Sequence, residues 1–172
     1  MHASLMISSQ KTTSSTARTR RFPCFAFLLL CVVLMGFSHL AMAHGDTAPQ
    51  PVDTGNLPKL GEEDWLARDP FATGEHHEEA IRVGSRGYNA NCARCHGLEV
   101  LSGGIAPDLR FLTRDCGGDE ECLADMEGYY IATVRKGRVR DGRVYMPPFE
   151  GIMSQEAMWA IHTYIESRPK ED

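Results

Sequence analysis

Apolar residues recur at intervals of three and four in three stretches of this chain, which is the spacing of one helix face. The first stretch begins near Glu78 and places five residues on that face: Ile81, Gly84, Tyr88, Cys92 and Cys95. A glycine on such a face lets another helix approach closely. No segment of useful length alternates between apolar and polar residues as a half-buried strand does. The pattern therefore predicts an all-α fold with three main helices.

The other two predicted helices span about residues 120–138 and 155–167. Asp119 and Ser154 precede them, and both are residue types that cap a helix N-terminus. Each cap is followed by an apolar stripe, which comprises Leu123, Met126, Tyr130 and Val134 in one helix and Met158, Ile161 and Ile165 in the other. Gly137 ends the first of these helices, and Pro169 follows the second.

The N-terminus has the pattern of a cleaved signal peptide, which we assign to residues 1–43. Basic residues without any acidic ones come first, an apolar run follows at residues 25–35, and Ala41-Met42-Ala43 forms a small-residue cleavage site. An uncleaved membrane anchor is the alternative, but the run is short of the ~20 residues that a span needs. We expect export to the periplasm and a mature chain that starts at His44 and has no membrane span.

The remaining chain divides into an irregular leader at residues 44–77, a compact domain at 78–168 and a short tail at 169–172. Four prolines interrupt regular structure in the leader. Trp65 and Phe71 are large apolar residues in this polar stretch. We expect them to pack on the domain, although contact with a partner protein is an alternative use for such side chains.

The charge of the chain excludes a general nucleic-acid binder. Its 172 residues include 23 acidic and 18 basic ones, which gives a net charge of −5, and every acidic residue lies after Ala43. So acidic a chain is repelled by a phosphate backbone. The length that remains after export suits one modest domain, and we expect a monomer.

The strongest chemical signal is Cys92-Ala93-Arg94-Cys95-His96, because Cys-x-x-Cys-His is the attachment signature of a c-type haem. The two thiols can form thioethers with the porphyrin, and His96 can offer an imidazole nitrogen to the iron. A redox dithiol and half of a zinc site are the alternatives. The motif occurs once, so we expect one covalently bound haem c and a role in electron transfer.

The sixth ligand of a His-bound haem iron decides between electron transfer and enzymatic chemistry. Met146 precedes Pro147-Pro148, which drive its backbone to an extended conformation in a loop. We predict that its thioether is the second axial ligand rather than a gap-filling side chain. A closed iron makes the chain an electron carrier and not an enzyme. A haem peroxidase with an open distal site is the remote alternative.

Two features close to the motif have predicted supporting roles. The carbonyl of Pro107 is a candidate acceptor for the other ring nitrogen of His96, although an ordinary surface loop is the alternative. Cys116 and Cys122 are left as an even pair after the signal peptide and the haem have claimed the other thiols. In an oxidising compartment we expect them to form a disulfide rather than two free thiols.

A basic run interrupts the acidic chain at residues 135–143, and it comprises Arg135, Lys136, Arg138, Arg140 and Arg143. Three interpretations are open. The run is a docking patch for an acidic partner, a means of neutralising a haem propionate, or a set of cations at a helix C-terminus.

From about residue 78 to 168 the chain resembles class I cytochrome c. The residues that carry the resemblance, in order, are Gly84-x-x-x-Tyr88, Cys92-x-x-Cys95-His96, Pro107-Asp108-Leu109, Met146-Pro147-Pro148 and the segment from Trp159 to Ile165. The resemblance implies a class I fold around one haem. It also implies that the first and last helices cross steeply, with Gly84 and Tyr88 against the aromatic stretch near Trp159 and Tyr164.

A narrower set of segments, at residues 49–52, 91–99, 102–110 and 144–151, is similar to the soluble cytochromes c that accept electrons from quinoprotein alcohol dehydrogenases. That resemblance implies a periplasmic role in the oxidation of ethanol or similar alcohols. The donor would be the dehydrogenase with its pyrroloquinoline quinone, and the acceptor a downstream oxidase or respiratory cytochrome. A general periplasmic carrier for another dehydrogenase or a terminal oxidase is the alternative.

Overall fold

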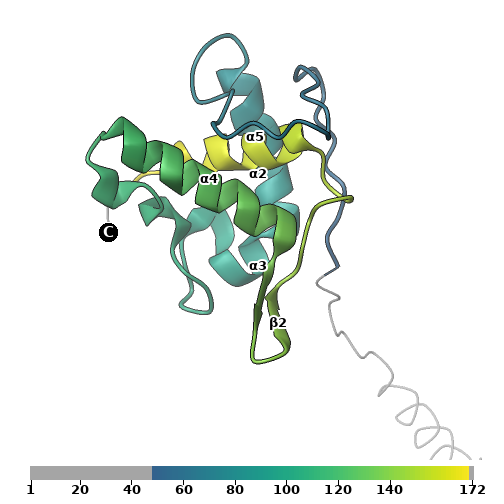
Figure 1. Ribbon diagram of the computed structural model, residues 1–172, viewed down its shortest axis with the longest axis vertical. Coiled ribbons are helices and arrows are strands. Elements are labelled where there is room, and N and C mark those ends of the chain that lie inside the picture. The colour runs from purple at the N-terminus through teal and green to yellow at the C-terminus, as the bar shows by residue number, and fades with distance from the viewer. Residues whose placement is uncertain (1–47, 171–172) are drawn as a thin grey trace, which may run out of the picture. The chain divides into compact units, whose positions relative to one another are not determined.

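The computed structural model describes residues 48–170, so the signal peptide predicted at residues 1–43 lies outside the described residues. Helices dominate the described chain (Figure 1). They are α2 (His77–Asn91), α3 (Ala93–His96), α4 (Glu120–Lys136) and α5 (Gln155–Glu166), with the 3-10 turns η2 (Leu98–Val100), η3 (Leu109–Phe111) and η4 (Arg114–Cys116) between α3 and α4. The three long helices were predicted within two residues at most ends. This is the class I all-α fold that the sequence indicates.

A short antiparallel hairpin follows α4 and corrects the expectation that no strand would form. It consists of β1 (Arg138–Arg140) and β2 (Arg143–Met146), which pair with Arg140 opposite Arg143 and with an irregularity next to Arg138. Both strands are exposed along almost their whole length. Because neither strand has a buried face, no alternation of apolar and polar residues marks them in the sequence.

Helices α2 and α5 cross steeply and form the centre of the domain, as the resemblance implied (Figure 1). Gly84 lies against α5 so closely that a Cβ atom there would overlap the carbonyl oxygen of Ala160 and lie 2.8 Å from the Cβ of Tyr164. One turn further along, the rings of Tyr88 and Tyr164 are 5.6 Å apart. A glycine is therefore required at the crossing because only a bare backbone fits between the two helices.

The buried face of α2 is not quite the one that the pattern suggested. Ala80, Val83 and Gly87 are buried together with Gly84 and Tyr88, whereas Ile81 is only partly buried. The predicted stripe also ran through Cys92 and Cys95, but α2 ends at Asn91 and a separate turn carries both cysteines.

Helix α5 is buried on all sides, because the leader covers the face that α2 leaves free. Every residue from Gln155 to Ile165 is buried. The side chains of Gln155 and Glu156 accept hydrogen bonds from the backbone N–H groups of Leu66 and Leu60, at 2.7 and 2.5 Å. Burial alone would raise the pKa of Glu156, but hydrogen bonds from Ser154 and the Leu60 N–H hold it below its ordinary value.

The two large apolar residues of the leader lie in different settings. Phe71 is 1% exposed and belongs to the core, as expected. Trp65 is partly buried, and the guanidinium of Arg135 lies over its ring at 4.0 Å from the centroid. The described leader is thus held by side chains of both α4 and α5.

None of the described helices is long and apolar enough to cross a membrane.

Candidate haem site

The Cys-x-x-Cys-His motif forms a single helical turn at the end of α2. The backbone N–H of Cys92 still donates to Tyr88 of α2, and the N–H groups of Cys95 and His96 donate back to the carbonyl of Cys92, at 3.1 and 3.0 Å. Gly97 then turns the chain away with a φ of +84°, a conformation that favours glycine. Tyr88 donates its hydroxyl hydrogen to the Gly97 carbonyl at 2.9 Å and fixes this turn to α2.

His96 is oriented by the loop that follows it. Its Nδ1 lies 2.9 Å from the carbonyl oxygen of Pro107. A carbonyl oxygen can only accept, so Nδ1 carries the hydrogen, and Nε2 keeps a free lone pair. This is the tautomer that a metal-binding imidazole needs when its other nitrogen is held by a carbonyl group.

The loop that presents Pro107 is itself fixed by side chains. The hydroxyl of Ser102 donates to the Ala106 carbonyl at 2.8 Å. Asp108 caps η3 by accepting from the Arg110 N–H, and it forms an ion pair with the Arg110 guanidinium at 2.6 Å. The Arg110 guanidinium is the main reason why the pKa of Asp108 lies below its ordinary value. The loop is therefore ordered by local polar contacts on both sides of Pro107.

Met146 comes from a part of the sequence distant from the motif, as the last residue of β2. It is partly buried, and the two prolines that follow lead into Phe149, which is buried and whose N–H donates to the Val134 carbonyl at 3.1 Å. Gly137 ends α4 beneath this segment. A Cβ atom at Gly137 would lie 2.7 Å from the Pro148 nitrogen and would overlap the carbonyl oxygen of Met146.

A single cavity of about 580 Å³ brings the predicted residues together. Cys92, Cys95, His96, Pro107 and Met146 all line it. Its volume is within the range of about 300–1,000 Å³ that cofactor pockets occupy. The rest of the lining is largely apolar and includes Leu109, Phe111, Leu112, Met126, Tyr130, Val134, Phe149, Ile161 and Ile165.

This lining fits a haem better than the two alternatives. A large apolar prosthetic group matches the apolar walls, and the free imidazole nitrogen and unpaired thiols match its points of attachment. Burial raises the pKa of the Cys92 thiol to about 12, whereas redox dithiols have a lowered thiol pKa. In the described chain no group of three or more His, Cys, Asp or Glu side chains could hold a metal ion, which argues against a zinc site.

Cys116 and Cys122 form a disulfide, as expected, and both line the same cavity. The disulfide connects η4 to the first turn of α4, which Asp119 caps by accepting from the Cys122 N–H at 2.8 Å. The pairing therefore also removes Cys116 and Cys122 as metal ligands.

The basic run divides into residues with different surroundings. Arg135 is partly buried between the Trp65 ring and Glu150, to which it donates at 2.7 Å. Arg138 lines the haem cavity, and its guanidinium lies 4.7 Å from the centroid of the Tyr129 ring and donates to the Thr133 hydroxyl. Arg140 and Arg143 are exposed on the hairpin. The sequence could not separate these surroundings because all five cations lie within nine residues.

Sequence analysis missed the aromatic and apolar residues at the edge of the cavity. Tyr129, Tyr145 and Ile105 line it and are still 54%, 63% and 79% exposed. Tyr145 lies on the unpredicted hairpin, and Ile105 lies in a loop that has no periodic pattern. Exposure of large apolar side chains was the only available signal, and it is visible only in the folded chain.

A helical domain with a Cys-x-x-Cys-His turn facing an apolar cavity defines a c-type cytochrome. The model of the family described as cytochrome c oxidase, cbb3-type, subunit III matches residues 79–165, and the chain belongs to this family of c-type cytochrome domains. Its cofactor is therefore covalently bound haem c, and it is an electron-transfer protein.

Among curated proteins, the chain is similar to cytochrome c550 from Pseudomonas aeruginosa, with 47% identity over 140 residues, which is 81% of this chain and 90% of the relative. It is also similar to parts of two Pseudomonas putida enzymes. Quinohemoprotein alcohol dehydrogenase ADH-IIG is 33% identical over 89 residues, and ADH IIB is 30% identical over 94 residues. These segments cover 52% and 55% of this chain but only 11% and 12% of the enzymes. No solved structure matches.

Proposed function

We propose that this chain is a periplasmic carrier with one His/Met-ligated haem, which accepts electrons from a quinoprotein alcohol dehydrogenase and passes them to the respiratory chain. Cys92 and Cys95 hold the haem through thioethers, His96 binds the iron through Nε2, and Met146 binds it through its sulfur. The position of all four residues on one cavity supports this assignment. Bound haem supplies a reversible one-electron couple, and a thioether ligand raises its potential.

The protein's own residues keep the site suited to electron transfer. The Pro107 carbonyl holds His96 in one tautomer and one orientation, and the Gly137 backbone allows the Met146 segment to pass close to α4. Apolar side chains exclude water from the walls of the cavity, which favours the less charged ferrous state. A ligand set that is fixed in this way changes little between oxidation states, so little reorganisation accompanies each electron.

The similarity to alcohol dehydrogenases is the observation that carries the choice of donor. About half of this chain matches a segment of two enzymes whose names combine a quinone, a haem and alcohol dehydrogenation in one protein. The chain also covers 90% of a relative whose name is that of a cytochrome alone, cytochrome c550. We infer that the chain serves as an acceptor for a dehydrogenase that holds the quinone.

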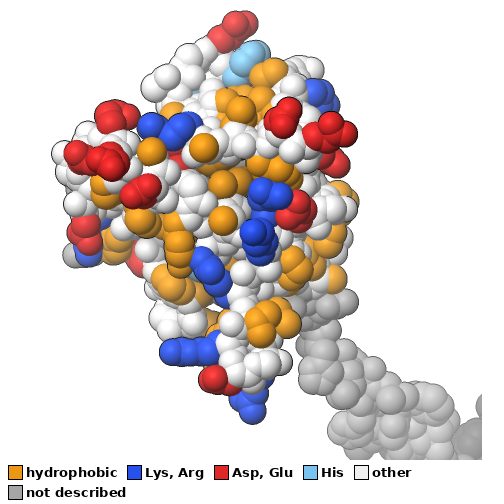
Figure 2. All heavy atoms as spheres, in the orientation of Figure 1, with side chains coloured by type: hydrophobic (Ala, Val, Ile, Leu, Met, Phe, Trp, Pro, Cys, Tyr) orange, Lys and Arg blue, Asp and Glu red, His pale blue; other side chains and the backbone are white. Residues whose placement is uncertain are grey.

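The exposed hairpin is the part of the surface best suited to meet that donor. Arg140 and Arg143 are exposed beside Tyr145, which lines the edge of the haem cavity. Figure 2 shows basic side chains over the hairpin at the lower end of the molecule, whereas most acidic ones lie over the upper part. Such a separation of charge steers an acidic partner towards the cavity.

The decisive experiment mixes the purified ferric protein with a quinoprotein ethanol dehydrogenase and ethanol and follows the haem absorbance. We expect reduction at a rate proportional to dehydrogenase concentration and no reduction without ethanol. No acceleration over background would favour the general periplasmic carrier instead. A far-red charge-transfer band in the ferric spectrum tests Met146 as a ligand separately. If that band is absent and the ferric protein binds cyanide rapidly, the peroxidase alternative is favoured.

A further inference from the structure

A second cavity, of about 290 Å³, lies beside α5 and shares no lining residue with the haem cavity. Five ionisable side chains line it: Asp69 from the leader, His77 from α2, Glu127 from α4, and His162 and Glu166 from α5. Glu166 keeps 26% of its side chain exposed, and the neighbouring Ser167 is exposed, so the cavity reaches the surface at that end. Neither the haem site nor the electron-transfer function accounts for it.

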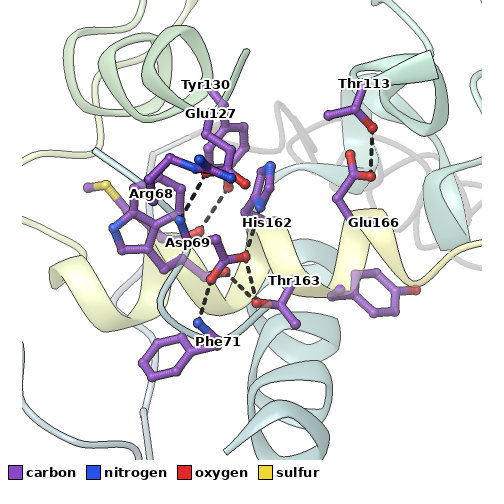
Figure 3. A network of polar contacts seen from close by, with 12 residues as sticks. Arg68, Asp69, Phe71, Thr113, Glu127, Tyr130, His162, Thr163 and Glu166 are labelled. Carbon is purple, nitrogen blue, oxygen red and sulfur yellow. Dashed lines mark hydrogen bonds and ion pairs between the residues drawn. The ribbon is translucent and has the colours of Figure 1, made fainter. Parts of the chain in front are cut away.

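His162 is held in this cavity by a buried carboxylate. Its Nδ1 lies 2.8 Å from Oδ2 of Asp69, and the two side chains are only 2% and 1% exposed (Figure 3). Asp69 also accepts from the Thr163 hydroxyl and from the Phe71 N–H, both at 2.8 Å. Each oxygen of Asp69 therefore accepts a hydrogen bond from another residue, and we assign the hydrogen between Asp69 and His162 to Nδ1 of the imidazole.

The other nitrogen of His162 has no partner among the described residues. Nε2 is buried, and Figure 3 shows it on the side of the ring turned away from Asp69. Oε1 of Glu166 is also buried and unpartnered within the described chain, while its Oε2 accepts from Thr113 at 2.8 Å and from Lys170 at 3.1 Å. Residues 162 and 166 are one helical turn apart and therefore neighbours on α5.

These two atoms form a site for a proton. In the neutral imidazole, Nε2 presents a lone pair, so the cavity contains two buried acceptors and no donor for them among the described residues. An unsatisfied buried acceptor is costly. A proton on Nε2 turns one acceptor into a donor, and it creates a cation in a cavity that the carboxylates of Asp69 and Glu166 also line. Nearby carboxylates favour such a cation.

One aromatic ring separates this site from the haem cavity. Tyr130 lines the haem cavity, and its ring centroid lies 4.7 Å from that of His162. On α5, Ile161 and Ile165 line the haem cavity from positions adjacent to His162 and Glu166. In this apolar interior, charges interact more strongly than in water. A negative charge added at the haem therefore favours a positive charge at His162.

We propose that His162 binds a proton more tightly when the haem is reduced, so that accepting an electron favours proton uptake at His162 and passing the electron on favours proton release. This inference rests on the proposed electron-transfer function. One electron from the donor reduces the haem iron from ferric to ferrous, and one proton from solvent adds to Nε2 without breaking any other bond. The titratable groups that line this cavity or contact His162 are Asp69 of the leader, His77 of α2, Glu127 and Tyr130 of α4, and Glu166 of α5. Two cations pair with members of this set: Arg68 with Glu127, and Lys170 with Glu166.

The test uses the haem-loaded full-length protein and an electrode, so it needs no dehydrogenase. The midpoint potential is measured between about pH 5 and 9, the range that includes ordinary histidine titration. Nuclear magnetic resonance follows the His162 ring in both oxidation states. We expect the potential to fall as pH rises while His162 loses its proton. We also expect proton affinity to be at least about threefold higher in the reduced protein, which is about 28 mV for a one-electron couple.

Three variants separate this effect from other titrating groups. H162Q should abolish the pH dependence in that range, whereas H76Q, a histidine that does not line the cavity, should retain it. E166Q keeps the histidine but removes one carboxylate, so half-protonation of His162 should move to lower pH. The proposal is overturned if His162 has the same proton affinity in both oxidation states, or if H162Q keeps the full pH dependence. Should H162Q not fold, the resonance measurements on the unaltered protein and E166Q decide the question. Failure of the dehydrogenase assay would leave this result unaffected.

Discussion

Gly137 lies directly beneath Met146, so the end of α4 and the end of the hairpin meet without any intervening side chain. We predict that Gly137→Ala displaces the Met146 segment, because the added methyl group overlaps backbone atoms that cannot rotate away. The far-red charge-transfer band of the ferric protein should weaken or disappear, and the reduction potential should fall. Gly142→Ala is the control, since Gly142 also has a positive φ, of +72°, but has open space around its Cβ position. Equal effects from both variants would mean that backbone strain, not overlap, is responsible.

The crossing of α2 and α5 gives a second prediction. Gly84→Ala should lower the free energy of unfolding by about 2 kcal/mol or more, because its Cβ would meet the Ala160 backbone. Gly128→Ala in α4 meets nothing and should be stabilising by about 0.5–1 kcal/mol. Denaturant unfolding of both variants measures the difference. A Gly84→Ala protein as stable as the unaltered chain would mean that the helices can move apart without cost.

The Cys116–Cys122 disulfide should contribute about 2 kcal/mol by closing a small loop in the unfolded chain. The double variant Cys116→Ala/Cys122→Ala should therefore unfold at lower denaturant concentration with an unchanged haem spectrum. Loss of the Met–iron band in this variant would instead indicate that the disulfide also shapes the haem cavity that both cysteines line.

Charge reversal at the hairpin tests the proposed docking surface. Arg140→Glu and Arg143→Glu together should slow reduction by the dehydrogenase about tenfold at low salt and should weaken its dependence on ionic strength. Arg86→Glu reverses an exposed cation on α2 and is the control. Because it reverses one charge and the test variant reverses two, the effects are compared per reversed charge. If the rate and its salt dependence change equally in both proteins, overall charge and not the hairpin governs association.

Acid stability depends on Asp108. Its pKa is lowered in the folded protein, chiefly by the Arg110 guanidinium, relative to the ordinary value of 3.8. A depressed folded pKa gives stability that is fully present above pH 3.8 and is lost as pH falls through the lower, folded value. Asp108→Asn should therefore be less stable at neutral pH and should lose less further stability on acidification. Unfolding curves at neutral pH and near pH 3 measure this, and parallel losses in both proteins would contradict it.

Local signals predicted the parts of the fold that local interactions determine. Asp119 and Ser154 cap their helices by accepting from the N–H groups of Cys122 and Ala157, as their sequence positions indicated. The haem motif was recognisable for the same reason, because its three functional side chains lie within five residues. Such features depend on neighbours in the chain and are visible in any sequence window.

Three features that depend on distant partners, or that have no buried side, were missed. The amphipathic pattern of α5 predicts one exposed face, but the leader buries that face through contacts between residues 89 to 96 positions apart. The Asp69–His162 pair spans 93 positions and leaves no periodic trace in the sequence. The hairpin has no buried side to mark it. In each case a tertiary contact, not a local preference, determines the structure.

The leader's attachment to α5 also constrains the order in which the chain can fold. Gln155, Glu156 and His162 lie close to the C-terminus, so the partners of the leader exist only once nearly the whole chain has been made. Contacts between residues so far apart in the chain form slowly, because the intervening loop must close first. We expect the domain to remain open until its last helix arrives, which leaves the thiols of Cys92 and Cys95 accessible during the interval in which haem must be attached.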